Sequence, residues 1–218
     1  MFSYHFVTQS KRMSAQWAEE NLNTIRTLME RVSVYRRALA PVAITVGLLG
    51  LAAAGLAVAM GWTGEGRFAG YWLAVAVVAL LAVLLLVRRQ AMRDKEEIMS
   101  PPMRRVVQAL APMLLAGLGL GVLEVLAREH RDSIRLIALW MVLYGGALHA
   151  AGFFMQRGLR WLGIIFVFCG ALCLCLHELG YVPALKENAH WLMGCAFGAN
   201  HLAYGLYLKL TAKPTDEE

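Results

Sequence analysis

Charged side chains are scarce in this sequence. Asp, Glu, Lys and Arg make up 17% of its 218 residues, while the apolar set AVILMFWYC makes up 59%. Soluble domains hold about 25% charged and about 45–50% apolar residues, and a soluble core of this size cannot bury such an excess. Composition therefore excludes a water-soluble enzyme, a disordered tail and a disulfide-stapled secreted module, and the mean hydropathy of +0.53 points to lipid.

Catalytic motifs are also lacking. The sequence contains no HExxH, GxSxG or phosphate loop and no pair of carboxylates on facing apolar segments, so we expect a protein that is not an enzyme. Its four cysteines, Cys169, Cys173, Cys175 and Cys195, all fall in apolar segments, which favours packing over a disulfide framework. The first forty residues lack a signal-peptide pattern, and we expect the first span to serve as its own insertion signal.

Six apolar segments are long enough to cross a bilayer as helices, which takes about 20 residues each. They are Pro41–Trp62, Phe68–Val87, Val106–Ala127, Leu136–Phe154, Leu159–Leu176 and Trp191–Leu208. The sequence thus predicts an all-α integral membrane bundle of six transmembrane helices over residues 40–210. Residues 1–39 form a predicted cytoplasmic amphipathic segment, and residues 211–218 form a predicted cytoplasmic tail.

The basic residues predict the orientation of these spans, because cytoplasmic loops carry the excess of Lys and Arg. Five basic residues fall on one side of the predicted bundle: Arg67, Arg128, Arg131, Arg135 and Lys186. The other sixteen of the 21 fall on the other side, and an even number of spans places both termini there. We therefore predict that both termini are cytoplasmic. Anionic headgroups and topology account for the pI of 9.4, and no nucleic-acid partner is expected.

The segment from about Ser14 to Leu39 reads as an amphipathic helix, with apolar residues at three- and four-residue steps. Two interpretations stay open. The helix lies on the headgroups of the bilayer with Trp17 and arginines as anchors, or it docks a membrane or cytoplasmic partner protein. The docking surface would use Trp17, Ile25, Met29 and Val32.

A short repeat links the fourth and sixth predicted spans. Gly146–Ala151, GALHAA, is echoed by Gly198–Ala203, GANHLA, and small residues at these spacings let membrane helices approach closely. Each copy carries a histidine, His149 or His201, at similar predicted depth. Two imidazoles at one level suit a b-type haem, which makes His149 and His201 candidate cofactor ligands. The alternative is a structural histidine that is hydrogen-bonded to a neighbouring helix.

Polar residues also gather where the predicted spans meet the non-cytoplasmic side. His130, His177, Glu178 and His190 are candidate metal ligands there, because imidazoles mixed with carboxylates suit Zn²⁺; interfacial polarity is the plainer interpretation. A transporter is a further alternative. The evidence for it is thin, because Glu124 is the one acidic residue well inside a predicted span.

Four stretches together resemble a known group of proteins: SPPMRRVVQALAPMLLAG, LWMVLYGGALHAAGFF, GLRWLG and GCAFGANHLAYGLYL. They are similar to small, multi-span bacterial inner-membrane proteins of unknown function, which are often encoded beside winged-helix regulators. The resemblance covers about residues 29–208 and implies the bacterial inner membrane as the location. The group's pattern includes a histidine matching His201 but not reliably one matching His149, which favours His201 as the single candidate.

These observations lead to one main hypothesis. We expect a non-enzymatic inner-membrane protein, an accessory, sensory or assembly component that acts through helix contacts. A haem- or metal-binding bundle for electron transfer or sensing is the alternative, and a small-solute or ion transporter ranks third.

Overall fold

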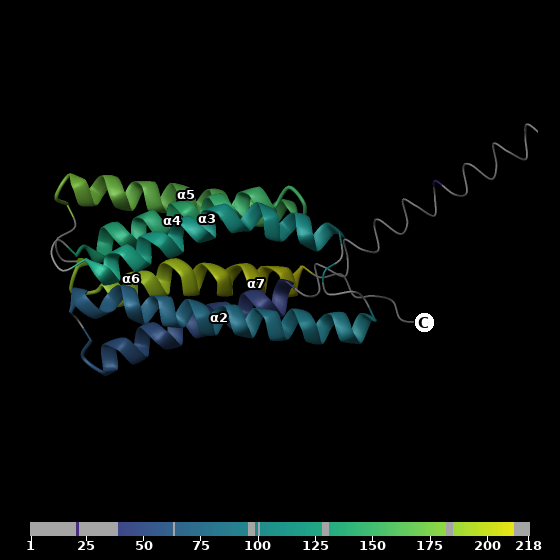
Figure 1. Cartoon of the computed structure of the whole chain (residues 1–218), viewed down its shortest axis with the longest axis horizontal. Coiled ribbons are helices and arrows are strands. Elements are labelled where there is room, and N and C mark those ends of the chain that lie inside the picture. The colour runs from purple at the N-terminus through teal and green to yellow at the C-terminus, as the bar shows by residue number, and fades with distance from the viewer. Residues whose placement is uncertain are drawn as a thin grey trace, which may run out of the picture. The chain divides into compact units, whose positions relative to one another are not determined.

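The structure, a computed structural model, describes Asn21 and residues 39–62, 64–95, 99, 101–127, 131–181 and 185–211 (Figure 1). The chain divides into two units, residues 1–37 and 38–218, and all of the described residues except Asn21 belong to the second. The described residues form helices and turns and contain no strand. The predicted all-α fold is confirmed at this level.

Among the described residues of the second unit, five helices are long and apolar enough to cross a membrane. They are the helix Leu39–Ala59, α2 (Glu65–Asp94), α3 (Pro101–Leu126), α4 (Ser133–Ala151) and α5 (Arg157–Glu178). The predicted sixth span falls on three consecutive pieces, α6 (Ala189–Met193), the π-helical segment η2 (Gly194–Ala199) and α7 (Asn200–Leu210). Each piece alone is too short to cross a bilayer, so the sixth span stays a prediction.

The helix α2 is longer than predicted. It continues from the expected end at Val87 to Asp94, because arginine is a good helix former and the helix does not stop where the apolar run stops. Lys95 ends it in the left-handed conformation, with φ 53° and its backbone N–H donating to the Ala91 carbonyl. The next helix begins at Pro101, where proline's missing N–H costs no hydrogen bond.

The helices α2 and α4 differ strongly in burial. In the most apolar 18 residues of each helix, 6% are buried in α2 and 56% in α4. Leu80, Leu81, Leu84 and Leu85 of α2 are each more than half exposed, at 57%, 55%, 55% and 67%. A helix with so much exposed apolar surface is suited to lipid rather than to water. The long apolar helices of the second unit are therefore compatible with a membrane protein.

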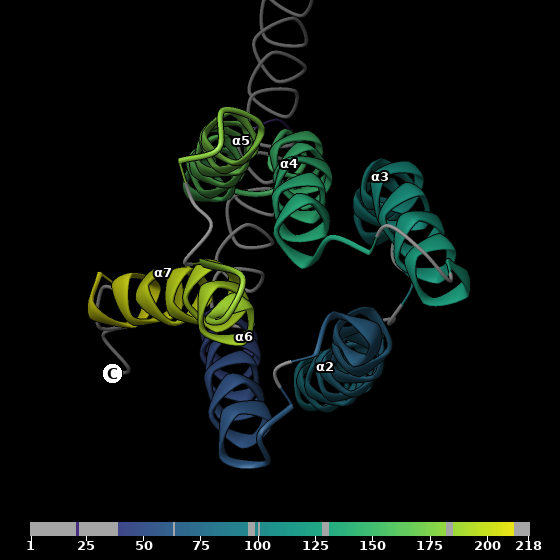
Figure 2. The same cartoon turned by 90° about the vertical axis from the view of Figure 1, so that its left-hand side faces the viewer.

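Viewed end-on, α4 lies between α5 and α3, and α2 follows α3 (Figure 2). Consecutive helices alternate in direction, so their termini gather at two ends of the bundle (Figure 1). We name the end that holds the C-terminus of α2 and the N-termini of α3 and α5 the basic end. The mixed-charge end holds the C-termini of α3 and α5 and the N-terminus of α4.

Glycines bring α4 and α5 into backbone contact. A Cβ atom on Gly145 would lie 2.6 Å from the carbonyl oxygen of Gly163, and a Cβ atom on Gly163 would lie equally close to the carbonyl oxygen of Gly145. Farther along the same pair, Gly170 faces the carbonyl of Ala138. Close approach of this kind supplies packing energy between membrane helices, for which no hydrophobic effect is available. We call these two helices the α4–α5 pair.

A second glycine-packed pair joins the helix Leu39–Ala59 to the C-terminal helical pieces. A Cβ atom on Gly47 would lie 2.6 Å from the Leu202 nitrogen, and one on Gly198 would lie 2.8 Å from the Leu51 nitrogen. The contacts continue to Gly194, which faces Ala54. We call this the Leu39–α7 pair. Of the two glycines that begin the repeat, Gly198 lies in this close contact, whereas a Cβ atom on Gly146 would lie an ordinary 3.9 Å from Met113.

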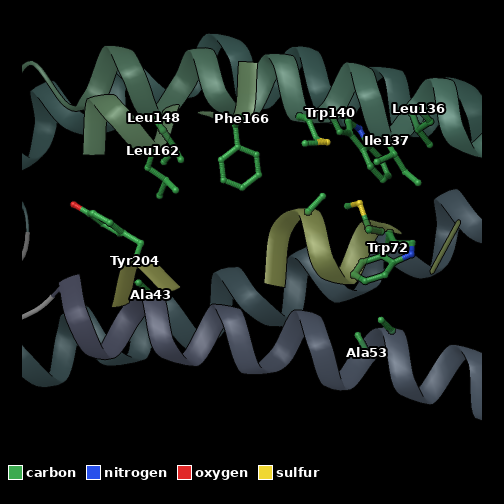
Figure 3. Packing of buried hydrophobic residues seen from close by; sticks show 14 of the residues in the cluster. Ala43, Ala53, Trp72, Leu136, Ile137, Trp140, Leu148, Leu162, Phe166 and Tyr204 are labelled. Atoms are coloured by element: carbon green, nitrogen blue, oxygen red, sulfur yellow. The ribbon is translucent and has the colours of Figure 1, made fainter. Parts of the chain in front are cut away.

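Large apolar side chains fill the space between the two pairs. Phe166 of α5 and Tyr204 of α7 lie between them in Figure 3, where Leu148 and Leu162 are also visible. Phe166, Ile134 and Ile137 are fully buried.

All four cysteines are free thiols. Since Cys175 and Cys195 are exposed, only Cys169 and Cys173 fit the expected packing role.

Candidate polar sites within the bundle

Two side chains at the start of α7 donate hydrogen bonds to the π-helical segment η2. In a π-helix the backbone N–H reaches five residues back instead of four, which shifts donors away from the carbonyls at its boundary. Asn200 Nδ2 donates to the Ala196 carbonyl at 2.7 Å, and His201 Nδ1 lies 2.6 Å from the Phe197 carbonyl. Both side chains therefore bond to carbonyl groups of η2 and stabilise the widened turn.

His201 also joins the Leu39–α7 pair to α4. The side chain is buried, with 6% of the residue exposed, and its Nε2 lies 2.7 Å from the Tyr144 hydroxyl. Because a carbonyl only accepts, Nδ1 carries the hydrogen that is donated to Phe197, and the Tyr144 O–H donates to Nε2. This arrangement satisfies both nitrogens of a neutral imidazole.

An aromatic cage surrounds this pair. The Tyr144 and His201 rings lie 5.4 Å apart, and Phe166 lies 5.3 Å from the first and 5.6 Å from the second. Phe197 lies 5.3 Å from Tyr144 and 5.1 Å from Phe166. Such apolar surroundings raise the free-energy cost of leaving the Tyr144 hydroxyl or the His201 imidazole without its hydrogen-bond partner. The Tyr144–His201 hydrogen bond therefore fixes how α4 and α7 are placed against each other.

His190 has a similar arrangement toward the mixed-charge end. Its Nε2 lies 2.6 Å from the Trp62 carbonyl, and Trp72 Nε1 donates to its Nδ1 at 3.2 Å. Phe68 and Tyr71 cover the ring, with centroids 5.1 and 5.6 Å away. His190 thus ties α6 to α2 and to the end of the helix Leu39–Ala59.

The local backbone explains why Trp62 is available to His190. After the helix Leu39–Ala59 the chain turns at Gly61, whose φ is +67°. Glycine adopts this conformation without strain. The Gly61 N–H donates to Val58, and the Trp62 N–H donates to Ala57, the bonding pattern of a Schellman motif. This turn sends the chain across to α2 with the Trp62 carbonyl directed at the imidazole.

His149 makes different contacts from His201. Its Nδ1 lies 3.4 Å from the Arg160 carbonyl, and its ring meets Phe153 edge-on at 5.2 Å. The two histidines share no contact residue among these interactions, and both nitrogens of His201 are already hydrogen-bonded. These contacts match the structural alternative. The haem site at His149 and His201 stays a prediction from the sequence.

The candidate metal ligands lie in separate interactions. His177 Nε2 is 2.7 Å from Asp132 Oδ2, Glu178 pairs with Arg135 at 3.9 Å, and His190 bonds to Trp62 as above. His130 lies outside the described residues. Within the part of the chain that the structure describes, no three His, Cys, Asp or Glu side chains are grouped to hold a metal ion.

Asp132 is the centre of the polar contacts at the mixed-charge end. It caps α4, with Oδ1 accepting from the Ile134 and Arg135 N–H groups at 3.1 Å, while its own N–H donates to Glu124 Oε1 at 2.7 Å. Partial burial favours the neutral acid, but the Arg135 N–H and the His177 ring outweigh it and lower the pKa of Asp132 below its ordinary value. Asp132 thus joins three helices, with its carboxylate bonded to α4 and α5 and its backbone N–H bonded to Glu124 of α3.

Arg131 and Lys186 are engaged at the same end. The Arg131 guanidinium donates to the Ala127, Val125 and Gly66 carbonyls at 2.7, 3.3 and 3.3 Å. Lys186 lies 3.6 Å from Glu65. Arg131 and Lys186 therefore link described segments of the mixed-charge end to the start of α2.

Sequence reasoning placed His201 as a candidate but missed its partners. Tyr144 and Trp72 are the donors to the two buried imidazoles, and each is far from its histidine in the sequence. The available signal was chemical: a hydroxyl or indole N–H inside an apolar helix requires an acceptor.

The candidate partner-binding residues Trp17, Ile25, Met29 and Val32 lie outside the described residues. Comparison of the chain with models of known families, with curated proteins and with solved structures finds no match.

Proposed function

We propose that this protein is a six-span protein of the bacterial inner membrane that acts through helix contacts and catalyses no reaction. The sixth span comprises α6, η2 and α7, whose five, six and eleven residues follow one another without a gap and total 22. At roughly 1.5 Å per residue they reach about 30 Å, the thickness of the hydrocarbon core. On resemblance alone, we group the chain with the small inner-membrane proteins named above.

One observation carries this proposal: many apolar side chains face outward, while the two buried imidazoles are hydrogen-bonded within the fold. Exposed leucines cover α2, and the two buried imidazoles, His190 and His201, each use both ring nitrogens within the fold. A histidine that is fully hydrogen-bonded to the protein serves helix placement rather than proton transfer to a substrate. The function therefore depends on how the helices are held together.

Cysteine labelling tests the number of spans and their orientation. The four native cysteines are replaced by alanine or serine, and single cysteines are introduced at Gly64, Met99, Tyr181 or Thr211, all exposed. We expect a membrane-impermeant maleimide to label the variants at Gly64 and Tyr181 in intact cells, and those at Met99 and Thr211 only after permeabilisation. Labelling at Thr211 from outside would contradict the sixth span.

A truncation tests the partner. We infer that the segment 1–38 docks a membrane or cytoplasmic protein, because its predicted apolar stripe is the part of the chain outside the spans that is suited to a helix contact. Deletion of residues 1–38 is expected to abolish co-purification of the partner while the remaining chain still inserts. Unchanged co-purification would remove the docking role and leave the membrane assignment in place.

A further inference from the structure

The basic side chains at the two ends of the bundle have different partners. At the mixed-charge end, Arg131, Arg135 and Lys186 each have a carbonyl or carboxylate partner. All the carboxylates whose side chains the structure describes also lie at that end: Glu65, Glu124, Asp132, Glu178 and Glu187. With Arg67 included, the described cations of that end number four against these five carboxylates, so its charge is balanced within the fold.

The basic end carries cations that form no ion pair with a carboxylate in the part of the chain that the structure describes. Its basic residues are Arg88, Arg89, Arg93 and Lys95 of α2 and its cap, Arg104 and Arg105 of α3, Arg157 and Arg160 of α5, and Lys209 of α7. All except Arg160 are exposed, and none has an ion pair with a described carboxylate. We call these nine residues the basic rim.

The sequence between the second and third helices does not neutralise this charge. From residue 88 to residue 105 it holds six basic residues and three acidic ones, Asp94, Glu96 and Glu97. The difference, six minus three, leaves +3 in that stretch alone. The remaining rim cations, Arg157, Arg160 and Lys209, add to it, so the nine rim cations outnumber the three acidic residues of that stretch.

The rim cations continue apolar surfaces along the same helix faces. On α2, Leu84 and Leu85 are 55% and 67% exposed, and Arg88 and Arg89 lie one turn farther, about 6 Å along the axis. A molecule on this face meets hydrocarbon first and positive charge next. That order matches a phospholipid, with acyl chains on the leucines and the phosphate on the arginines.

Aromatic residues frame the rim at the corner between α4 and α5. Phe153 and Trp161 are 64% and 66% exposed, and the Arg160 guanidinium lies over the Phe153 ring, 5.1 Å from its centroid. Exposed aromatic rings beside arginines are typical of the boundary between hydrocarbon and headgroups. An acidic peptide or nucleic acid would use the cations but leave these rings and the leucines of α2 uncovered.

We propose that the basic rim selectively binds anionic phospholipid headgroups. The inference rests on the membrane-spanning part of the proposed function and does not depend on which side of the membrane the rim faces. Arg88, Arg89 and Arg93 form its main part on α2, because they extend beyond the apolar run on a helix that contributes little to the core. Bound lipid would then balance the positive charge that remains on these arginines.

Lipid retention by the purified full chain tests this proposal. Protein in an uncharged detergent is titrated with dioleoyl phosphatidylglycerol or dioleoyl phosphatidylcholine, and bound lipid is counted by native mass spectrometry. We expect at least about tenfold preference for phosphatidylglycerol, which falls when about 0.5 M NaCl screens the charges. Equal retention of the two lipids by the wild-type protein would overturn the proposal.

Matched triple variants locate the site. R88Q/R89Q/R93Q should lower phosphatidylglycerol retention by about tenfold or more, since each cation at a lipid surface contributes about fivefold. R67Q/R135Q/K186Q removes the same charge from the mixed-charge end and should stay within about twofold of wild type. Equal losses in the two variants would mean that net charge alone attracts the lipid, which overturns the assignment to the rim.

Two further measurements keep failure modes apart. R88K/R89K/R93K retains the charge and should restore retention, so a loss in the lysine variant as well would contradict an electrostatic rim. If the glutamine variant does not fold, the wild-type preference and its salt dependence still decide the proposal. Reversed labelling of Met99 and Gly64 combined with a retained lipid preference would overturn the proposed orientation alone.

Discussion

The two glycine-packed helix pairs reach the same closeness by different backbones. In the α4–α5 pair both helices are uninterrupted, and Gly145 and Gly163 place each helix on the carbonyl groups of the other. In the Leu39–α7 pair one partner contains the π-helical segment η2, and Gly47 and Gly198 make equally short approaches. Small residues are therefore sufficient for close packing and do not account for the π-helical turn.

What distinguishes the second pair is its polar side chains. The residues that follow η2, Asn200 and His201, donate to its carbonyls, and His201 also accepts from Tyr144 of α4. The α4–α5 pair has at the matching repeat position His149, with one long contact of 3.4 Å to Arg160. A shared sequence repeat has thus produced a buried, doubly bonded imidazole in one pair and a half-buried, weakly bonded one in the other.

The largest expected effect comes from filling the glycine contact of the α4–α5 pair. In Gly145→Ala the new Cβ atom would meet backbone atoms of Gly163 and Val167 at 2.6 and 2.7 Å, so the helices must separate. We expect about 3 kcal/mol of destabilisation, the upper part of the range for overpacking, measured by thermal unfolding in detergent. Gly119→Ala is the matched control, since nothing lies within 4 Å of that position; equal losses would contradict the packing role.

A smaller effect is expected from His201→Leu, which tests the polar part of the comparison. The substitution leaves the Tyr144 hydroxyl and the Phe197 carbonyl without the imidazole, at a cost of about 2 kcal/mol. His149→Leu, the same change at the other copy of the repeat, should cost less than about 1 kcal/mol. In a Tyr144→Phe background the cost of His201→Leu should shrink, because the two residues share one hydrogen bond; strict additivity would refute their coupling.

The smallest effect is expected at Asp132, outside both pairs. Asn at this position still caps α4 but carries no charge toward His177. A carboxylate with a lowered pKa stabilises the fold above its unfolded value of about 3.9, and that contribution is lost as the pH falls through the folded value. The stability difference between wild type and Asp132→Asn should therefore shrink below about pH 4. A difference that stays constant as the pH falls below about 4 would contradict this role of the Asp132 charge.

The sequence located helices well and burial poorly. Apolar runs predicted five helices that the structure describes, with shifts at their ends where charged residues such as Arg93 remain helical. They did not predict that α4 is the most buried. Its mean hydropathy of 1.5 is the lowest of the five, and that of α2, 2.7, is the highest. A helix that faces lipid must be apolar, whereas the protein interior supplies hydrogen-bond acceptors to Tyr144 and Trp140 of α4.

The candidate site was predictable only in part. His201 is conspicuous in the sequence, because an ionisable group within an apolar segment is costly. Its partner Tyr144 is separated from it by 57 residues, and only tertiary packing brings them together. The π-helical turn had no sequence signature, since its residues GCAFGA are common in any membrane helix. The pairing of His190 with Trp72 was hidden for the same reason.

The Leu39–α7 pair also sets the order in which the molecule can be completed. Ribosomes make chains from the N-terminus, so the helix Leu39–Ala59 exists long before Gly194, Gly198 and Leu202, which pack against it. Until that late segment is synthesised, Gly47 and Gly50 lack the helix that covers them. Contacts between such distant parts of a chain close slowly. The packing of the helix Leu39–Ala59 is therefore completed only after η2 and α7 have been synthesised. A nascent chain that is released before then would leave Gly47 and Gly50 uncovered.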